Sequence, residues 1–318
     1  MESRLGGTWA RRTLPIPELI ARKAGRSVSV VIPALNEEAT VAGVVASIRP
    51  LAGTLVDDIL VLDSGSTDAT AARARAAGAR VVARAEALPG VPVRPGKGEV
   101  LWRSLAATGG DLVVFIDGDL IDPDPEFVPA LLTPLLTGDD IHLVKGCYRR
   151  PLHGTGDEGG RVTQLVARPL LTALVPDLAD LMQPLGGEYA ATRALLTTIP
   201  FAPGYGVEIG IVLDTWRRHG AGGIAQVELG TRTHRNRPTR ELAVMSRQIV
   251  GTLVTRLGIG DSGQGLIQFR GTADGWHAET AELLLEDRPP LAELLTDEAP
   301  PGSVSAGCSS AGLLGTGW

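Results

Sequence analysis

The sequence predicts an α/β fold in which a mostly parallel, twisted sheet is flanked by helices. Short hydrophobic runs alternate with amphipathic helical stretches through the first half of the chain, and this alternation is typical of parallel strands joined by right-handed crossovers. The hydrophobic run at 112–116 is followed directly by Asp117-Gly118-Asp119. Such a run is typical of a strand buried on both faces, as in a parallel sheet covered by helices.

The individual elements follow from hydrophobic period and turn residues. We expect strands at 27–32, 59–62, 80–82, 111–117 and 142–148, and helices at 37–48, 67–77, 99–108, 161–174, 207–218 and 240–257. Ser66 is expected to cap the second helix. Beyond residue 142 the rhythm loosens, which predicts a C-terminal elaboration on the same sheet. Residues 1–26 are interpreted as an N-terminal arm, and the Gly-, Ser-, Ala- and Pro-rich segment 291–318 as a disordered tail.

Composition excludes several classes of protein. The 318 residues are 44% hydrophobic and 21% charged, an ordinary globular composition. A net charge of −6 does not favour nucleic-acid binding. No apolar run approaches the ~20 residues of a membrane span, and no secretory signal follows Arg11 and Arg12. Two distant cysteines, Cys147 and Cys308, argue against a disulfide framework and favour a cytoplasmic location.

Four polar loops follow the predicted strands and should gather at one rim of the sheet, where ligands bind in open α/β folds. They begin at Pro33, Asp63, Gly96 and Asp117. The small residues of the first loop admit a flat base, and Asp63 or Glu37 can accept hydrogen bonds from a uracil or ribose. Lys97 can reach a phosphate, and Asp119 can hold a divalent cation against a diphosphate.

Each loop also has a simpler explanation. Asp117-Gly118-Asp119 is compatible with an ordinary turn, 36–38 with helix-start chemistry, and Lys97 with a solvated loop. The coincidence of four such loops at one rim favours a nucleotide site over four unrelated features.

Motifs along most of the chain carry a family resemblance. They lie at 30–38 (VVIPALNEE), 62–68 (LDSGSTD), 93–99 (VRPGKGE), 102–108, 148–152, 159–163 (GGRVT), 187–190, 200–210 and 234–238 (HRNRP). Together they resemble the actinobacterial glucosyl-3-phosphoglycerate synthases, retaining glycosyltransferases of the GT-A (Rossmann-like) fold, family 81. The resemblance covers roughly residues 8–290.

The resemblance implies a transfer of glucose from UDP-glucose to D-3-phosphoglycerate with Mg²⁺ or Mn²⁺, in a homodimer. It implies a nucleotide-sugar half at 27–145 and an acceptor half at 146–290. By position it assigns Pro33, Ala34, Leu35, Glu37 and Ser64 to the uridine, Lys97 to the phosphates, and Asp117 and Gly118 to the nucleotide. It assigns Asp119 and His234 to the metal, Gly160, Arg161, Thr163 and Asn236 to the acceptor, and Tyr205 and Glu208 to the sugar pocket. Asp119, Lys97 and Glu208 are the catalytic candidates.

The chemistry of the residues agrees with this assignment. A carboxylate with an imidazole suits Mn²⁺ better than Mg²⁺. Arg161 follows two glycines at a predicted helix start, a good receptor for a phosphate. Since no carboxylate stands out as a nucleophile, we favour attack by the acceptor on the leaving-group face, with the departing phosphate helping to remove its proton.

Three departures from the family pattern leave the donor open. Gly118, Gly146-Cys147 and Gly186 stand where serine, Ser-Phe and serine are usual, and we expect them to enlarge or depolarise the sugar side. GDP-mannose, another sugar nucleotide or a specialised-metabolite acceptor is therefore an alternative. A non-catalytic sugar-nucleotide binder is an alternative of another class. A haloacid-dehalogenase-type phosphatase also ends a strand in Asp-x-Asp, but on its first strand.

Overall fold

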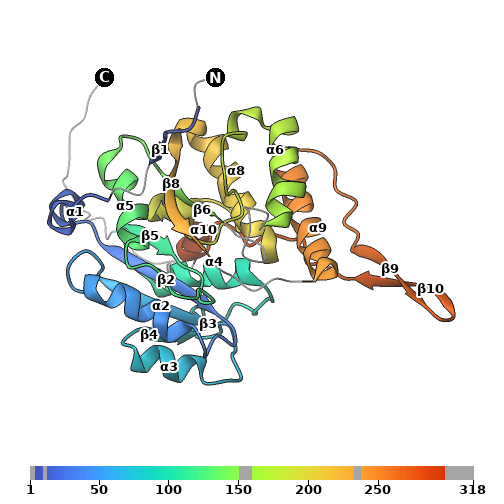
Figure 1. The fold of residues 1–318 in the computed structure, drawn as a ribbon, viewed down its shortest axis with the longest axis horizontal. Coiled ribbons are helices and arrows are strands. Elements are labelled where there is room, and N and C mark those ends of the chain that lie inside the picture. Colours follow the sequence, from blue (N-terminus) through green and yellow to red (C-terminus); the bar gives the residue numbers. More distant parts are fainter. Residues whose placement is uncertain (1–3, 10–12, 150–159, 233–237, 298–318) are drawn as a thin grey trace, which may run out of the picture.

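The computed structural model describes residues 4–9, 13–149, 160–232 and 238–297. Its centre is an eight-stranded sheet in the order β1-β8-β6-β7-β5-β2-β3-β4 (Figure 1). The strands are β1 (Gly7–Trp9), β2 (Val28–Ala34), β3 (Asp58–Asp63), β4 (Arg80–Ala83), β5 (Leu112–Phe115), β6 (Leu143–Arg149), β7 (Tyr189–Thr192) and β8 (Ile224–Thr231).

All neighbouring pairs are parallel except those of β7, which runs antiparallel to both β5 and β6. This confirms the predicted mostly parallel sheet and the strands near 27, 59, 80, 111 and 142. The sequence reading missed β7 and β8. One antiparallel strand reverses the chain between the two halves of the sheet, so that β5 and β6 still end at the same edge.

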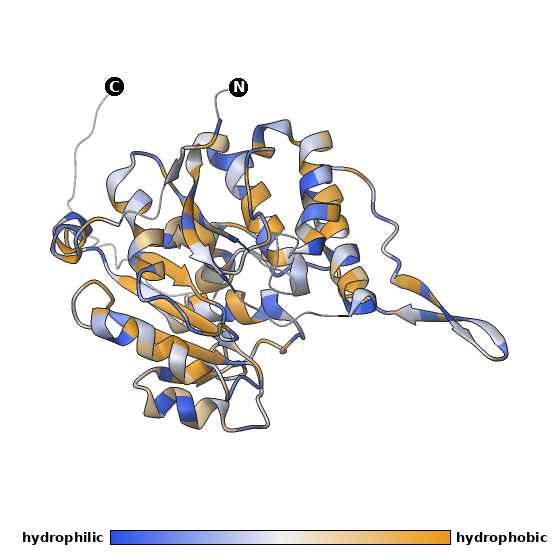
Figure 2. Cartoon of the chain, viewed as in Figure 1, coloured by the Kyte–Doolittle hydropathy of each residue, from blue (hydrophilic) through white to orange (hydrophobic). Residues whose placement is uncertain are grey.

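Helices cover both faces of the sheet, because alternate strand residues point to opposite sides. Val30 and Val114 pack on one face, and Val31 and Val113 on the other. The first face is covered by α1 (Ile16–Lys23), α2 (Val41–Ile48), α3 (Thr70–Ala76) and α5 (Phe127–Thr137). The second is covered by α4 (Lys97–Ala107), α6 (Arg168–Leu174), α7 (Arg193–Thr198), α8 (Val207–His219), α9 (Thr239–Arg256) and α10 (Leu291–Asp297). Figure 2 shows the hydrophobic residues concentrated in the central strands.

Three expectations about local structure are corrected. The N-terminal arm is partly built into the sheet, since β1 pairs with β8 at its edge. The predicted tail begins with α10, whose Leu291 is fully buried in the core. Ser66 does not cap α3, which begins at Thr70. Its Oγ instead accepts a hydrogen bond from the backbone N–H of Asn36 at 2.9 Å, because the segment before α3 interlocks with the loop after β2.

Two further features lie outside the predicted pattern. The expected helix at 161–174 forms, but its middle (Thr163–Ala167) is π-helical. β9 (Leu266–Thr272) and β10 (Gly275–Ala281) form an antiparallel hairpin that projects from the body of the molecule (Figure 1). Of the helices that the structure describes, none has the length and apolar character of a membrane span.

Candidate functional site

A cavity of about 440 Å³ opens at the carboxyl ends of β2, β3 and β5. This is the edge at which open α/β sheets bind their ligands. The cavity is lined by Pro33, Ala34, Leu35, Glu37, Ser64, Arg84, Pro95, Gly96, Lys97, Val100, Asp117, Gly118, Asp119 and Tyr205. The structure thus brings together every residue that the family resemblance assigns to the nucleotide, with the metal candidate Asp119 and the sugar candidate Tyr205. Asp63, the other predicted acceptor for uracil or ribose, does not line this cavity and accepts a hydrogen bond from the backbone N–H of Ser66 at 3.2 Å.

The wall formed by the first two loops is held by hydrogen bonds between them. The backbone N–H of Ser64 donates to the carbonyl of Ala34 at 2.8 Å. The N–H of Glu37 donates to Thr70 Oγ1 at 2.8 Å. Arg84 Nη1 reaches Ser64 Oγ at 3.2 Å. Sequence reasoning missed Arg84, since a lone arginine after a short strand carries no motif.

The opposite wall carries opposing charges in direct contact. Lys97 Nζ lies 2.7 Å from Asp117 Oδ1 and 2.7 Å from Glu208 Oε1. Burial alone would lower the pKa of Lys97, but the two carboxylates raise it well above its ordinary value. Burial would likewise raise the pKa of Asp117, but Lys97 and Arg232 hold it far below its usual range. These side chains therefore stay ionised across the physiological range.

Arg232, on the segment after β8, is the most connected residue of this wall, and the sequence reading did not select it. Its Nη2 lies 3.1 Å from Asp117 Oδ2 and 2.9 Å from Asp119 Oδ1. Its Nη1 contacts Glu188 Oε1 at 3.1 Å and the Tyr148 hydroxyl at 3.0 Å. Glu188 is fully buried. A buried carboxylate needs a cationic partner, but the burial of Glu188 is visible only in the structure, so the sequence carried no signal for Arg232.

Three glycines beside or behind this wall allow close packing of their neighbours. A Cβ at Gly187 would lie 2.2 Å from Asp117 Oδ2, and one at Gly118 would lie 2.9 Å from the carbonyl of Pro33. A Cβ at Gly146 would lie 2.4 Å from Leu229 Cδ1. Within the described residues, neither Gly146 nor Gly186 lines the cavity. The expected widening of the sugar side is therefore wrong at Gly146, where the side chain of Leu229 fills the space.

The acceptor candidates that the structure describes do not line this cavity. Gly160 (φ 76°), Arg161 and Thr163 stand at the start of the helical segment before α6, and this segment packs against α9. None of the three lines the cavity among the described residues. His234 and Asn236, like most of the glycine-rich loop at 154–160, lie outside the described residues.

The side chains of the cavity suit a divalent cation that is bound mainly by oxygen atoms of the substrate. Over the described ranges, no group of three or more His, Cys, Asp or Glu side chains forms a closed metal site. Asp119 is 38% exposed in its side chain, and its Oδ1 lies 2.9 Å from Arg232 Nη2. Mg²⁺ and its relatives are commonly bound by one or two carboxylates plus substrate phosphates. An accessible carboxylate on a cavity of nucleotide size fits this pattern.

Fold and cavity together define a glycosyltransferase of the GT-A type. The sequence model of the family described as glycosyl transferase family 2 matches residues 29–160. Glucosyl-3-phosphoglycerate synthase of Mycolicibacterium smegmatis is 62% identical over 90% of this chain and 96% of its own length. The enzyme of that name from Mycobacterium tuberculosis is 61% identical over 90% of this chain and 92% of its own.

Solved structures agree. The M. tuberculosis enzyme in complex with Mn²⁺, UDP and phosphoglyceric acid superposes with a TM-score of 0.86 at 60% identity, over 91% of this chain and 99% of the other. Its complex with Mn²⁺, UDP-glucose and phosphoglyceric acid gives a TM-score of 0.84 at 61% identity, over 91% and 99%. The chain belongs to the glucosyl-3-phosphoglycerate synthase family.

Proposed function

We propose that this protein transfers glucose from UDP-glucose to 3-phosphoglycerate, in a metal-dependent reaction that retains the anomeric configuration. One observation carries the proposal. The residues that the family resemblance assigns to the uridine and the phosphates line one cavity with the metal candidate Asp119, in a chain about three-fifths identical to synthases of this name. Relatives have been crystallised with UDP-glucose, phosphoglyceric acid and Mn²⁺, or with UDP and Mg²⁺.

The donor side is proposed to work through residues 27–145. Pro33, Ala34, Leu35, Glu37 and Ser64 hold the uridine, and Asp117 and Gly118 contact the nucleotide. Lys97 is already paired with two carboxylates, so a phosphate arriving at the cavity meets a cation whose position is fixed. A preset positive charge stabilises the developing negative charge of the leaving UDP without reorganisation.

Mg²⁺ or Mn²⁺ would be held by Asp119 and His234 and would supply Lewis-acid stabilisation of the diphosphate leaving group. Asp119 projects an accessible carboxylate for this purpose. Arg232 orients that carboxylate from the protein side, because its Nη2 binds both Asp117 and Asp119.

The acceptor side is proposed to lie in residues 146–290. Gly160, Arg161, Thr163 and Asn236 bind the phosphoglycerate, and Tyr205 and Glu208 line the sugar pocket. The guanidinium of Arg161 and the backbone N–H groups at its helix start suit the phosphate.

Retention is proposed to follow the same-face route. Asp117 of the cavity wall and Glu208 behind it are each ion-paired to Lys97 at 2.7 Å, which weakens them as nucleophiles. A mass-spectrometric search for a glycosyl-enzyme tests this, because a trapped adduct on Asp117 or Glu208 would defeat the same-face route.

The proposed activity is tested by a screen of donors against acceptors. Purified protein with Mg²⁺ or Mn²⁺ is given UDP-glucose, GDP-mannose or another sugar nucleotide, each with 3-phosphoglycerate or a related acid, and products are read by mass. Glucosyl-3-phosphoglycerate from UDP-glucose is the expected product. A product from another pair would reassign the substrates, and tight UDP binding without turnover on any acceptor would favour the non-catalytic binder.

A homodimer in the cytoplasm is part of the proposal. The projecting β9–β10 hairpin exposes Ile267, Phe269 and Trp276, with 53%, 64% and 78% of each residue accessible. Exposed apolar arms of this kind mark interaction surfaces. The buried free thiol of Cys147 suits a reducing compartment. Light scattering on the wild type and on Phe269→Glu with Trp276→Glu tests the dimer, which the double variant should convert to a monomer.

A further inference from the structure

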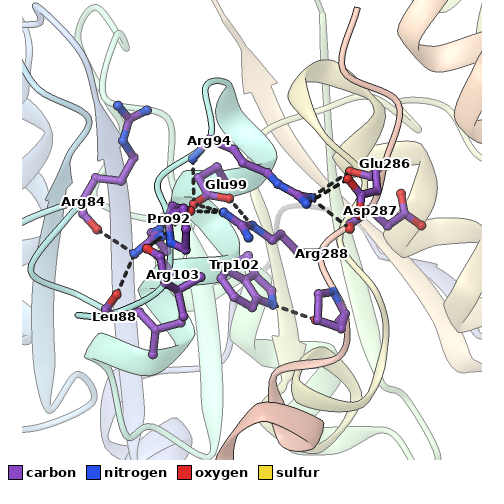
Figure 3. Close-up of polar contacts among 12 residues, drawn as sticks. Arg84, Leu88, Pro92, Arg94, Glu99, Trp102, Arg103, Glu286, Asp287 and Arg288 are labelled. Atoms are coloured by element: carbon purple, nitrogen blue, oxygen red, sulfur yellow. Dashed lines mark hydrogen bonds and ion pairs between the residues drawn. The ribbon is translucent and has the colours of Figure 1, made fainter.

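A buried ion-pair cluster lies behind the cavity wall, at the start of α4. Glu99 is 3% exposed, Arg103 is fully buried and Arg288 is 9% exposed. Arg103 Nε lies 2.5 Å from Glu99 Oε1, and Arg288 Nε lies 2.6 Å from Glu99 Oε2 (Figure 3). Burial would raise the pKa of Glu99, but hydrogen bonds from Arg288 and Arg103 lower it, so the carboxylate stays charged.

The two guanidiniums also hold the loop between β4 and α4, which has no regular secondary structure of its own. Arg103 Nη1 donates to the carbonyl of Leu88 at 2.9 Å, and its Nη2 donates to the carbonyls of Val91 at 2.6 Å and Pro92 at 3.1 Å. Arg288 Nη2 also donates to Pro92. This loop and the first turn of α4 supply Arg84, Pro95, Gly96, Lys97 and Val100 to the cavity wall.

Arg288 belongs to a distant part of the chain, residues 284–290, which we call the C-terminal strap. Its backbone forms two hydrogen bonds with Phe201, of 2.9 and 3.0 Å. Trp102 Nε1 donates to the carbonyl of Pro289 at 2.9 Å, and the Arg288 guanidinium lies 5.0 Å from the centre of the Trp102 ring. Figure 3 shows the strap crossing α4 at this point.

Phe201 in turn precedes the segment that reaches the sugar side of the cavity. That segment packs tightly on α4, since a Cβ at Gly98 would lie 2.0 Å from the carbonyl of Ala202, and one at Gly96 would lie 2.9 Å from Gly204 Cα. One arginine therefore bonds through its side chain to the Lys97 wall and through its backbone to the segment that leads to Tyr205.

We propose that Arg288 is a positioning residue, which sets Lys97 and the loop before it at the distance that the donor diphosphate requires. The inference rests on the proposed function only in taking the cavity as a UDP site. It extends the donor site to a strap that lies outside residues 29–160, the part matched by the glycosyl transferase family 2 model.

The test is the affinity for UDP with Mn²⁺, measured by calorimetry on the full chain without acceptor. Arg288→Met should weaken UDP binding about tenfold, since displacements of an ångström at a remote site have effects of this order or larger. Arg288→Lys keeps the charge but not the paired contacts, and should recover part of the loss.

Arg256→Met is the matched control. Arg256 is 7% exposed and pairs with Asp214 and with Asp287 of the same strap, at 2.9 and 2.6 Å. The Arg256→Met substitution should lower the melting temperature and leave the affinity for UDP unchanged. If Arg288→Met also lowers only the melting temperature, the inference is overturned.

A double-variant cycle separates positioning from a general loosening of the cavity. Arg288→Met raises the logarithm of the dissociation constant for UDP by some amount in the wild type. In a Lys97→Met background the same substitution should raise it by less than half of that amount. An equal effect in both backgrounds would overturn the inference. If Arg288→Met does not fold, Arg288→Lys is carried through the same cycle. Because no acceptor is present, the outcome is independent of whether the protein glucosylates 3-phosphoglycerate.

Discussion

Two ion-pair clusters meet at the start of α4 and both pair carboxylates with basic side chains, yet they differ in what surrounds them. The cavity cluster (Lys97, Asp117, Asp119, Glu208 and Arg232) borders open space, and Asp119 keeps a side chain that is 38% exposed. The buried cluster (Glu99, Arg103 and Arg288) is closed, and its guanidiniums also donate to the backbone carbonyls of Leu88, Val91 and Pro92. Charges that can receive a ligand and charges that hold a loop are therefore told apart by accessibility and not by residue type.

The largest effect is expected at the open cluster. Asp119→Asn keeps the size of the side chain. It weakens the contact with Arg232 and removes the negative charge that Asp119 offers to a metal. We expect kcat/KM to fall about a thousandfold, in the range seen when one transition-state contact is lost. Metal-dependent UDP binding should be lost as well, with little change in melting temperature. Asp122→Asn, at an exposed position of the same loop, is the control and should behave as wild type.

The buried cluster should respond in the opposite way. Glu99→Gln leaves two buried guanidiniums facing a neutral amide, so we expect the free energy of unfolding to fall by about 3 kcal/mol. Urea denaturation measures this directly. Glu18→Gln removes an exposed i,i+4 pair with Arg22 and should cost less than about 0.5 kcal/mol. Equal losses for the two variants would show that the buried cluster does not hold the loop.

The two clusters also differ in how far the sequence predicted them. Lys97, Asp117, Asp119 and Ser64 follow strands of the parallel sheet, so hydrophobic runs and the polar residues after them located the cavity. Arg232 meets Asp117 and Asp119, and Arg288 meets Glu99, from more than 100 residues away, and no periodicity predicts such a contact. The strand β7 was missed for a related reason. Its four residues, Tyr189–Thr192, lie among glycines and short polar segments and give no clear alternation.

A pH experiment sharpens the comparison at Lys145 in β6, behind the open cluster. Its Nζ is 4.4 Å from the centre of the Tyr189 ring and donates to the carbonyl of Gly186. Burial lowers the pKa of Lys145 from 10.5 to about 8, and Lys97 contributes in the same direction, against the opposing charges of Glu208, Glu188 and Asp117. Between these two values the unfolded chain binds the proton and the folded one does not, so stability rises with pH.

We therefore compare the unfolding free energy of the wild type with that of Lys145→Met. As the pH rises from 8 to 9, the difference between them should shift by about 1 kcal/mol in favour of the wild type. The window stops at pH 9, because burial raises the pKa of the Cys147 thiol from 9.0 to about 11 and stability falls with pH beyond that point. Parallel urea titrations of the two proteins measure the difference. A constant difference across the window would mean that Lys145 keeps its proton in the folded state.

The smallest effect is expected where the strap touches the loop at the surface. Arg94 Nη2 lies 2.9 Å from Glu286 Oε2, and Glu286 is 74% exposed in its side chain, so water and salt screen the pair. Arg94→Met should cost less than about 1 kcal/mol in unfolding free energy and leave UDP affinity within twofold. Calorimetry and urea denaturation, run beside Arg288→Met, measure both. A loss of UDP affinity equal to that of Arg288→Met would break the comparison, because any contact between the loop and the strap, and not the buried pairing with Glu99, would then govern the donor site.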